Sequence, residues 1–179
     1  MAGQTRLALW LLSGGEHALR DIEAAALLHA AAESGDALAQ EQLGLLYGRG
    51  RVVAEDPAAA ARWFGLAAEQ GRITATYNLG LAFLQGRGVE RDPERALEWI
   101  GSAAARGLPA AWLKLAGMYE HGVGTPSDLE QAAYWYALAA AQGDGSAAGR
   151  RDALAESLDD AARQRLALRL QSLRDGLDP

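Results

Sequence analysis

Residues 79–107 read LGLAFLQGRGVERDPERALEWIGSAAARG, and the spacing of their leucine, glycine, aspartate, tryptophan and alanine residues recurs on both sides. The step between equivalent positions is 36 residues. A fixed period of roughly 20–50 residues is the signature of a repeat architecture, so the sequence predicts a repeat protein. The recurring positions are Leu43, Leu79 and Leu115; Tyr47, Phe83 and Tyr119; Gly50, Gly86 and Gly122; Asp56, Asp92 and Asp128; Trp63, Trp99 and Trp135; Ala67–Ala68, Ala103–Ala104 and Ala139–Ala140; and Gly35, Gly71, Gly107 and Gly143.

Each repeat contains two apolar stripes with helical spacing. Apolar residues three or four positions apart lie on one face of a helix, which has 3.6 residues per turn. A single pair of such helices cannot bury both stripes, so stacked neighbours must supply the core. In the first complete repeat the stripes are Ala39, Leu43, Leu46 and Tyr47, followed by Ala60, Trp63, Phe64, Ala67 and Ala68.

The second helix of each repeat has recognisable start and stop signals. Asp56 precedes Pro57, and this order places a side-chain acceptor at the N-cap and proline at the first helical position. Asp128 is followed three residues later by Gln131, which resembles a capping box. Gly71 and its equivalents follow the last turn, where glycine adopts a left-handed conformation without steric cost.

The two ends of the chain fit the repeat less well. Subtracting 36 residues places Leu7, Leu11, Gly14, Leu27 and Ala31–Ala32 on the repeat positions, so residues 1–34 are interpreted as a divergent first repeat. Complete repeats are expected at 35–70, 71–106 and 107–142. After Gly143 the pattern changes, since Arg151 replaces the expected leucine, and residues 143–179 are interpreted as a C-terminal cap. The expected fold is therefore a single all-α solenoid domain with about nine or ten helices.

The repeated motif closely resembles the Sel1-like repeat, a relative of the tetratricopeptide repeat. The resemblance rests on Leu79-Gly80, Phe83, Gly86-x-Gly88-Val89, Asp92, Ala96, Trp99, Ala103–Ala104 and Gly107. It implies a right-handed α/α solenoid whose first helices line a concave face, and an adaptor role in protein complexes. Three positions depart from the motif: Val52 replaces the second loop glycine, Thr125 replaces valine, and Ala116 replaces the helical glycine.

Composition argues against several classes of function. The net charge of -6 does not suit binding to a phosphate backbone, which requires clustered lysine and arginine. The chain contains no cysteine, so disulfides, thiolate metal sites and cysteine nucleophiles are excluded. Leu7–Leu12 is too short an apolar run for a signal peptide, and no stretch is long enough to span a membrane. We expect a cytoplasmic, monomeric bacterial protein.

Candidate chemical groups have simpler structural explanations. The three repeated tryptophans are expected to pack in the core, and Gly48-Arg49-Gly50 and Gly86-Arg87-Gly88 are expected to form turns, because they lack the phosphate-loop spacing. The three histidines, His17, His29 and His121, have no metal-motif spacing, so no metal or other cofactor is predicted. No serine lies in a nucleophile motif. The loop arginines Arg49, Arg51, Arg87 and Arg91 either share one edge that binds an acidic partner or are simply solvated.

Two functions of different classes remain open. The favoured one is a non-enzymatic scaffold or adaptor that binds a peptide or partner protein on the concave face. The alternative is a β-lactam-binding or hydrolysing enzyme, because cysteine-rich bacterial relatives of the repeat have been linked to that activity. The missing cysteines favour the scaffold.

The partner is expected to contact first-helix positions that the core stripe does not use. On a helical wheel these positions lie away from Ala39, Leu43 and Tyr47. The alternative is that the same side chains pack between neighbouring first helices. The predicted partner-binding residues are Glu41, Gln42, Leu45, Tyr77, Asn78, Leu81, Leu113 and Lys114.

Overall fold

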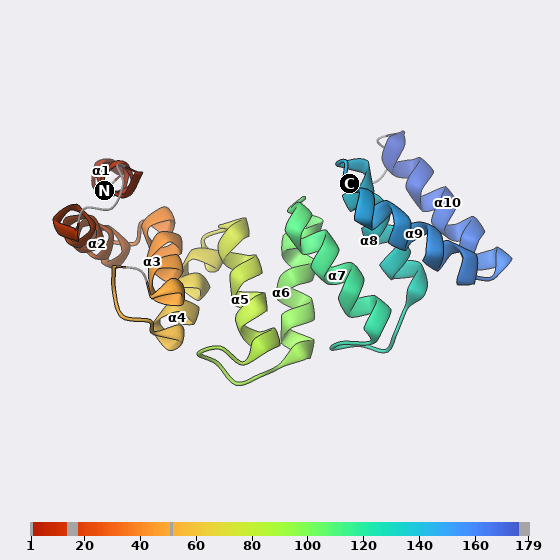
Figure 1. The fold of residues 1–179 in the computed structure, drawn as a ribbon, viewed down its shortest axis with the longest axis horizontal. Helices are drawn as coiled ribbons and strands as arrows, with labels where there is room; N and C mark the ends of the chain where they lie inside the picture. Colours follow the sequence, from red (N-terminus) through yellow and green to blue (C-terminus); the bar gives the residue numbers. More distant parts are fainter. Residues whose placement is uncertain (1, 14–17, 51, 176–179) are drawn as a thin grey trace. The chain divides into compact units, whose positions relative to one another are not determined.

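A computed structural model of the chain describes residues 2–13, 18–50 and 52–175 (Figure 1). These residues form ten α-helices and no strand, which confirms the predicted all-α solenoid. Gly14, His17 and Arg51, which the sequence analysis singled out, lie outside the described residues. The helices are α1 (Ala2–Ser13), α2 (Ala18–Glu33), α3 (Ala37–Arg49), α4 (Pro57–Glu69), α5 (Ile73–Gln85), α6 (Pro93–Ala105), α7 (Pro109–His121), α8 (Leu129–Ala141), α9 (Gly145–Ser157) and α10 (Asp160–Arg174).

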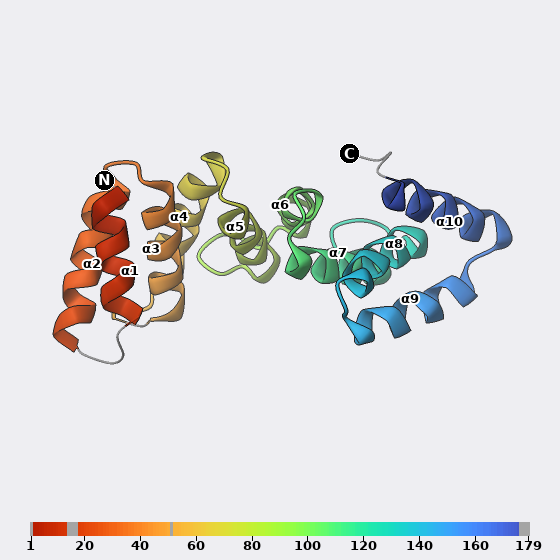
Figure 2. The same cartoon turned by 90° about the horizontal axis from the view of Figure 1, so that it is seen from above.

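The chain divides into two compact units, residues 1–92 and 93–179. In the first unit α1 to α4 lie side by side, and α5 packs against α4 (Figure 2). In the second unit α6 to α9 pack in sequence, and α10 lies against α8. Each unit contains a hydrophobic cluster of its own, built around Leu28 and Leu43 in the first and around Ala132 and Leu166 in the second.

The turn between successive repeats explains why a glycine recurs at a fixed distance after the alanine pair. Gly71 N–H donates to Ala68 O at 2.9 Å, and Arg72 N–H donates to Ala67 O at 3.0 Å. These bonds close the end of α4 in the manner of a Schellman motif, which needs a positive φ, here +85° at Gly71. The same bonds recur after Ala31–Ala32, Ala103–Ala104 and Ala139–Ala140.

The loop inside each repeat is closed by another recurring set of bonds. Asp56 N–H donates to Tyr47 O at 3.0 Å, and the Asp56 carboxylate accepts from Ala59 N–H at 2.9 Å. Asp128 makes the same N-cap bond to Gln131 N–H at 3.0 Å. Asp56 and Asp128 are therefore N-caps, as predicted.

Val52 occupies the second loop-glycine position in a left-handed conformation, with φ +75°. Gly88 has the same φ at the equivalent position. A Cβ atom on Gly88 would overlap the Pro57 carbonyl, so this loop lies directly on the start of α4. Val52 keeps the backbone shape of the repeat at a steric cost, because a β-branched residue rarely adopts a positive φ.

The N-terminal repeat contradicts the expected alignment by one residue in its first helix. Leu7, which was aligned with Leu43, is 46% exposed, whereas its neighbour Ala8 is fully buried. Thr5 and Leu11 are buried on the same side as Ala8. The first helix therefore aligns with the next repeat at a step of 35 residues, whereas the buried Ala31 and Ala32 of α2 keep the step of 36.

The tryptophan prediction was right in part. Trp63 and Trp135 pack against the hydrophobic clusters of their units but are only half-buried. The next residue along the chain is more deeply buried in two repeats: Phe64 is 7% exposed and Ile100 is fully buried. The side chain that fills the repeat interior is thus the residue after tryptophan in these two repeats.

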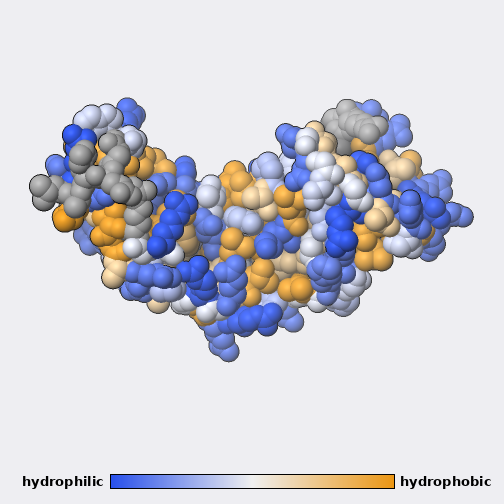
Figure 3. Space-filling model, in the orientation of Figure 1, coloured by the Kyte–Doolittle hydropathy of each residue, from blue (hydrophilic) through white to orange (hydrophobic). Residues whose placement is uncertain are grey.

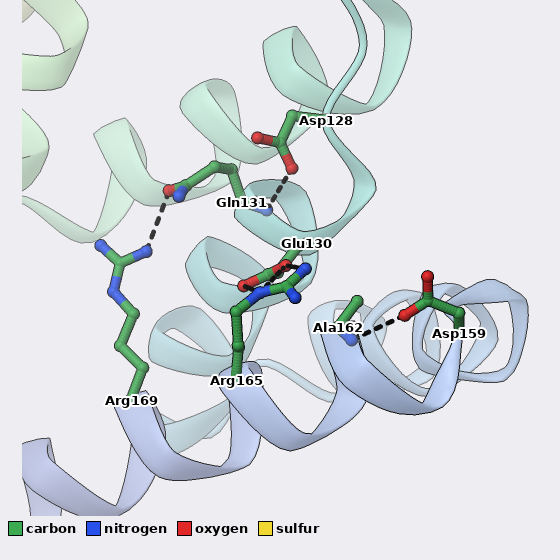
Figure 4. Close-up of polar contacts among 7 residues, drawn as sticks. All are labelled: Asp128, Glu130, Gln131, Asp159, Ala162, Arg165 and Arg169. Carbon is green, nitrogen blue, oxygen red and sulfur yellow. Dashed lines mark hydrogen bonds and ion pairs between the residues drawn. The ribbon is translucent and has the colours of Figure 1, made fainter.

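The C-terminal cap consists of the two helices α9 and α10. Polar contacts join α10 to α8 (Figure 4): Arg165 forms an ion pair with Glu130 at 2.6 Å, and Arg169 donates to Gln131 Oε1 at 3.0 Å. The Arg169 guanidinium also lies 3.5 Å from the centre of the Tyr134 ring. Asp159 caps α10 by accepting from Ala162 N–H at 2.7 Å.

Candidate functional site

The first unit contains a cavity of about 280 Å³ between α3, α4 and α5, which we call the α3–α5 cavity. Every residue that lines it lies in one compact unit. Its apolar side chains come from all three helices, and its polar side chains come from α3, α5 and the loop after α5. The lining residues are Gly44, Leu45, Gly48, Arg49, Pro57, Ala60, Ala61, Phe64, Asn78, Leu81, Ala82, Gln85 and Arg87.

Small residues on α3 and α4 create this space. Gly44 on α3 carries no side chain, and the ring of Phe64 packs against its backbone; a Cβ at residue 44 would lie 2.5 Å from Phe64 Cε1. Ala60 and Ala61 supply short side chains from α4. The first-helix glycine of the repeat motif therefore allows an aromatic side chain to form an apolar wall of the cavity.

Three polar side chains of the cavity are available for hydrogen bonding. Within the described ranges, the side chains of Arg49, Asn78 and Gln85 form no hydrogen bond or ion pair. Arg87 is engaged, because its Nη2 donates to Gly48 O at 3.2 Å and to Glu55 Oε1 at 2.6 Å. Apolar walls with a few converging polar groups are the usual form of a small-molecule or cofactor site, and the cavity shares this combination.

Three of the predicted partner-binding residues line the α3–α5 cavity: Leu45, Asn78 and Leu81. Gln42 on α3 and Tyr77 on α5 are half-buried and lie outside its lining. Burial raises the pKa of the Tyr77 phenol above its ordinary value. The structure thus brings together Leu45, Asn78 and Leu81 from two successive first helices.

Glu41 is not an exposed binding residue. Its side chain is 5% exposed and forms a two-pronged ion pair with Arg72, with Nη2–Oε1 and Nε–Oε2 distances of 2.9 and 3.1 Å. The hydrogen bond to Glu41 is the main cause of the raised pKa of Arg72. Because a partner would have to displace Arg72 to reach this carboxylate, we remove Glu41 from the candidate surface.

Leu113 and Lys114 lie on α7 in the second unit. Leu113 is 37% exposed, and Lys114 is half-buried. Their role in binding stays a prediction.

On the face seen in Figure 3, hydrophobic residues reach the surface in small groups among hydrophilic ones.

The sequence analysis missed Trp10. With the one-residue correction in α1, Ala8 aligns with Leu43, so Trp10 aligns with the cavity residues Leu45 and Leu81. Trp10 is 65% exposed. Aligning the first helix at a step of 35 residues would have placed Trp10 at the same repeat position as Leu45.

The loop arginines do not form a common free edge. Arg87 pairs with Glu55, and Arg91 Nε donates to Leu84 O at 3.2 Å. Arg49 belongs to the α3–α5 cavity. Of the described loop arginines, Arg49 is therefore the one that stays a candidate for binding an acidic partner.

The side chain of His29 contacts two aromatic side chains. Its Nε2 lies 3.0 Å from the Tyr47 hydroxyl, and its ring contacts the Tyr47 and Trp63 rings edge-on. No group of three or more His, Asp or Glu residues among the described positions is arranged to hold a metal ion.

The repeat motif matches a known family along most of the chain. The Sel1 repeat model matches residues 2–36, 37–71, 73–108 and 109–144. The chain belongs to the Sel1 repeat family. Sel1 repeats generally mediate protein–protein interaction and generally act as non-enzymatic scaffolds.

Two solved structures show the same Sel1 architecture. A Sel1 repeat protein from Oxalobacter formigenes is 31% identical, with a TM-score of 0.73, and the alignment covers 84% of this chain and 44% of that one. The protein c5321, a protective antigen present in uropathogenic Escherichia coli strains and displaying an SLR fold, is 28% identical, with a TM-score of 0.51 and coverages of 92% and 43%. The chain thus spans less than half the length of either protein.

No curated protein matches this Sel1 repeat chain. Within the described residues, no helix combines the length and the apolar character needed to cross a membrane.

Proposed function

We propose that this protein is a non-enzymatic interaction module that binds a segment of a partner protein in the α3–α5 cavity. The observation that carries the proposal is the cavity itself. It joins apolar side chains, including Leu45, Leu81 and Phe64, to the unengaged polar groups of Arg49 and Asn78. Apolar anchors beside a few polar contacts are typical of protein interfaces.

Trp10 extends the proposed binding surface along the first helices. Its alignment with Leu45 and Leu81 places it on the equivalent face of α1. Exposed tryptophans are enriched among the residues that dominate binding energy. A partner segment that continues past the α3–α5 cavity would meet this indole.

The proposal is tested by capture of native partners with two matched leucine variants. Leu81→Ser alters the cavity wall, whereas Leu66→Ser alters a leucine on α4 that is 41% exposed and outside the cavity lining. We expect Leu81→Ser alone to lose the partner, with melting temperatures of both variants close to the parent. Equal capture by both variants would reject the α3–α5 cavity as the binding site.

A further inference from the structure

We infer that the α3–α5 cavity selects a protein segment that places a carboxylate next to a large apolar side chain. The inference rests on the proposed function and specifies the chemistry of the partner. It follows from the charges, the shape and the free polar groups of the cavity.

The two first helices that flank the cavity carry very little charge. The α5 sequence, ITATYNLGLAFLQ, contains no charged residue, and α3 contains Glu41 and Arg49. Glu41 forms an ion pair with Arg72. Arg49 is the other charged residue of these two helices, and within the described structure it has no ion-pair partner. The cavity therefore presents a cation to its occupant.

The other cation of the cavity lining is already neutralised. Arg87 forms its ion pair with Glu55, and no carboxylate lines the cavity among the described residues. A basic segment would be desolvated here without an opposite charge, whereas an acidic segment would gain Arg49 as a partner. Selection against the wrong charge is a common source of specificity in interfaces.

The apolar wall of the cavity favours an apolar side chain beside that carboxylate. Leu45 and Leu81 lie on successive first helices, and Phe64 packs beneath the Gly44 backbone. A polar side chain packed against these three residues would lose hydrogen bonds to water and find no replacement among them. An aliphatic or aromatic side chain would instead gain from burial against these three residues.

Asn78 provides a further recognition group. Its amide has a donor and an acceptor, and the side chain is unengaged in the described structure. These two functions match the C=O and N–H groups of a peptide backbone. Asn78 can therefore hydrogen-bond to the main chain of the bound segment, between the apolar side chain and the carboxylate of that segment.

The experiment is selection of a random peptide display library on the full-length protein, followed by affinity measurements with the selected peptides. Three variants are compared: Leu81→Arg in the cavity wall, Arg49→Glu at the cation, and Arg62→Glu as the charge control. Arg62 is an exposed arginine on α4 outside the cavity lining. Melting temperatures show that each variant is folded, and Leu45→Ser replaces Leu81→Arg if the latter is not.

We expect the selected peptides to combine Asp or Glu with a neighbouring Leu, Ile or Phe. Arg49→Glu should weaken their binding by about tenfold, more than the loss of one exposed ion pair, because the charge is reversed. Arg62→Glu should leave the affinity within about twofold of the parent. Added salt should weaken the parent complex, because it screens the attraction to Arg49, and should strengthen the Arg49→Glu complex, because it screens the repulsion between the two carboxylates.

Two different failures are distinguishable. If no peptide is enriched, or if the cavity-wall variant binds the selected peptides as well as the parent does, the proposed function itself is wrong. If the peptides require the cavity wall but show no acidic preference, or bind Arg49→Glu undiminished, only the inferred charge selection is wrong.

Discussion

The Phe64 ring packs against the backbone of Gly44, and this contact between α4 and α3 forms part of the wall of the α3–α5 cavity. The repeat thus uses glycine in a helix where alanine has the higher helical propensity, at a cost of about 0.8–1 kcal/mol. The stability and the proposed binding site of the first unit consequently depend on the same position.

Substitution of Gly44 should therefore lower stability although it raises helix propensity. Gly44→Ala is expected to cost about 1–3 kcal/mol of unfolding free energy, because its Cβ would collide with the Phe64 ring. Gly48→Ala on the same helix is the control: its Cβ would meet Ala60 at 3.8 Å, an ordinary contact. Urea unfolding should show a neutral or stabilising effect for the control. Equal effects of the two variants would contradict the packing described here.

Val52 offers a stabilising substitution. Val52→Gly should raise the unfolding free energy by about 1 kcal/mol, because glycine adopts the observed φ of +75° without the steric cost paid by a β-branched residue. Gly88→Ala, at the equivalent loop position, should be strongly destabilising because of the overlap with Pro57. The urea midpoints of the two variants and the parent test this prediction. A lower midpoint for Val52→Gly would show that packing of the valine side chain stabilises the protein by more than the positive φ destabilises it.

The residue after tryptophan should contribute more to stability than the tryptophan itself. Ile100→Ala is expected to cost about 2–5 kcal/mol, because Ile100 is fully buried. Trp99 is half-buried, so Trp99→Ala should cost less than Ile100→Ala. Both are measured in the same denaturant series. The opposite order would restore the original interpretation of tryptophan as the main core residue.

Much of the fold could be predicted from the sequence because its signals are local. The Ala–Ala…Gly pattern predicts the turn that Gly71 closes, and Asp56 before Pro57 predicts a helix start. The alignment of α1 was wrong because its step is 35 residues. Gly14 and Gly15 are adjacent, so a loop glycine fits a step of 36 as well as one of 35, and Asp21, 35 residues before Asp56, marks the difference.

The candidate site was harder to predict because it depends on contacts between repeats. A helical wheel places Glu41 away from the core stripe but contains no information about Arg72, which follows 31 residues later and pairs with it. The spacing placed Leu45, Asn78 and Leu81 on the same face of their helices, and all three line the cavity. The cavity between them arises from Gly44, Ala60 and Phe64, whose contacts the spacing does not show.

The Glu41–Arg72 ion pair should be revealed by a double-mutant cycle. Arg72→Gln leaves a carboxylate that is only 5% exposed without its cation, and is expected to cost about 1–3 kcal/mol. Adding Glu41→Gln should recover part of this loss, because the double variant buries no unpaired charge. Additive effects of the two substitutions in urea unfolding would mean that the pair contributes nothing to stability.

The binding site is tested most directly without any substitution, by NMR of leucine methyl groups in the protein alone and in complex with a captured partner. We expect the methyl signals of Leu45 and Leu81 to shift on binding and those of Leu66, which lies on α4 outside the cavity lining, to stay in place. Shifts at Leu66 with unchanged signals from Leu45 and Leu81 would contradict the assignment of the α3–α5 cavity as the binding site.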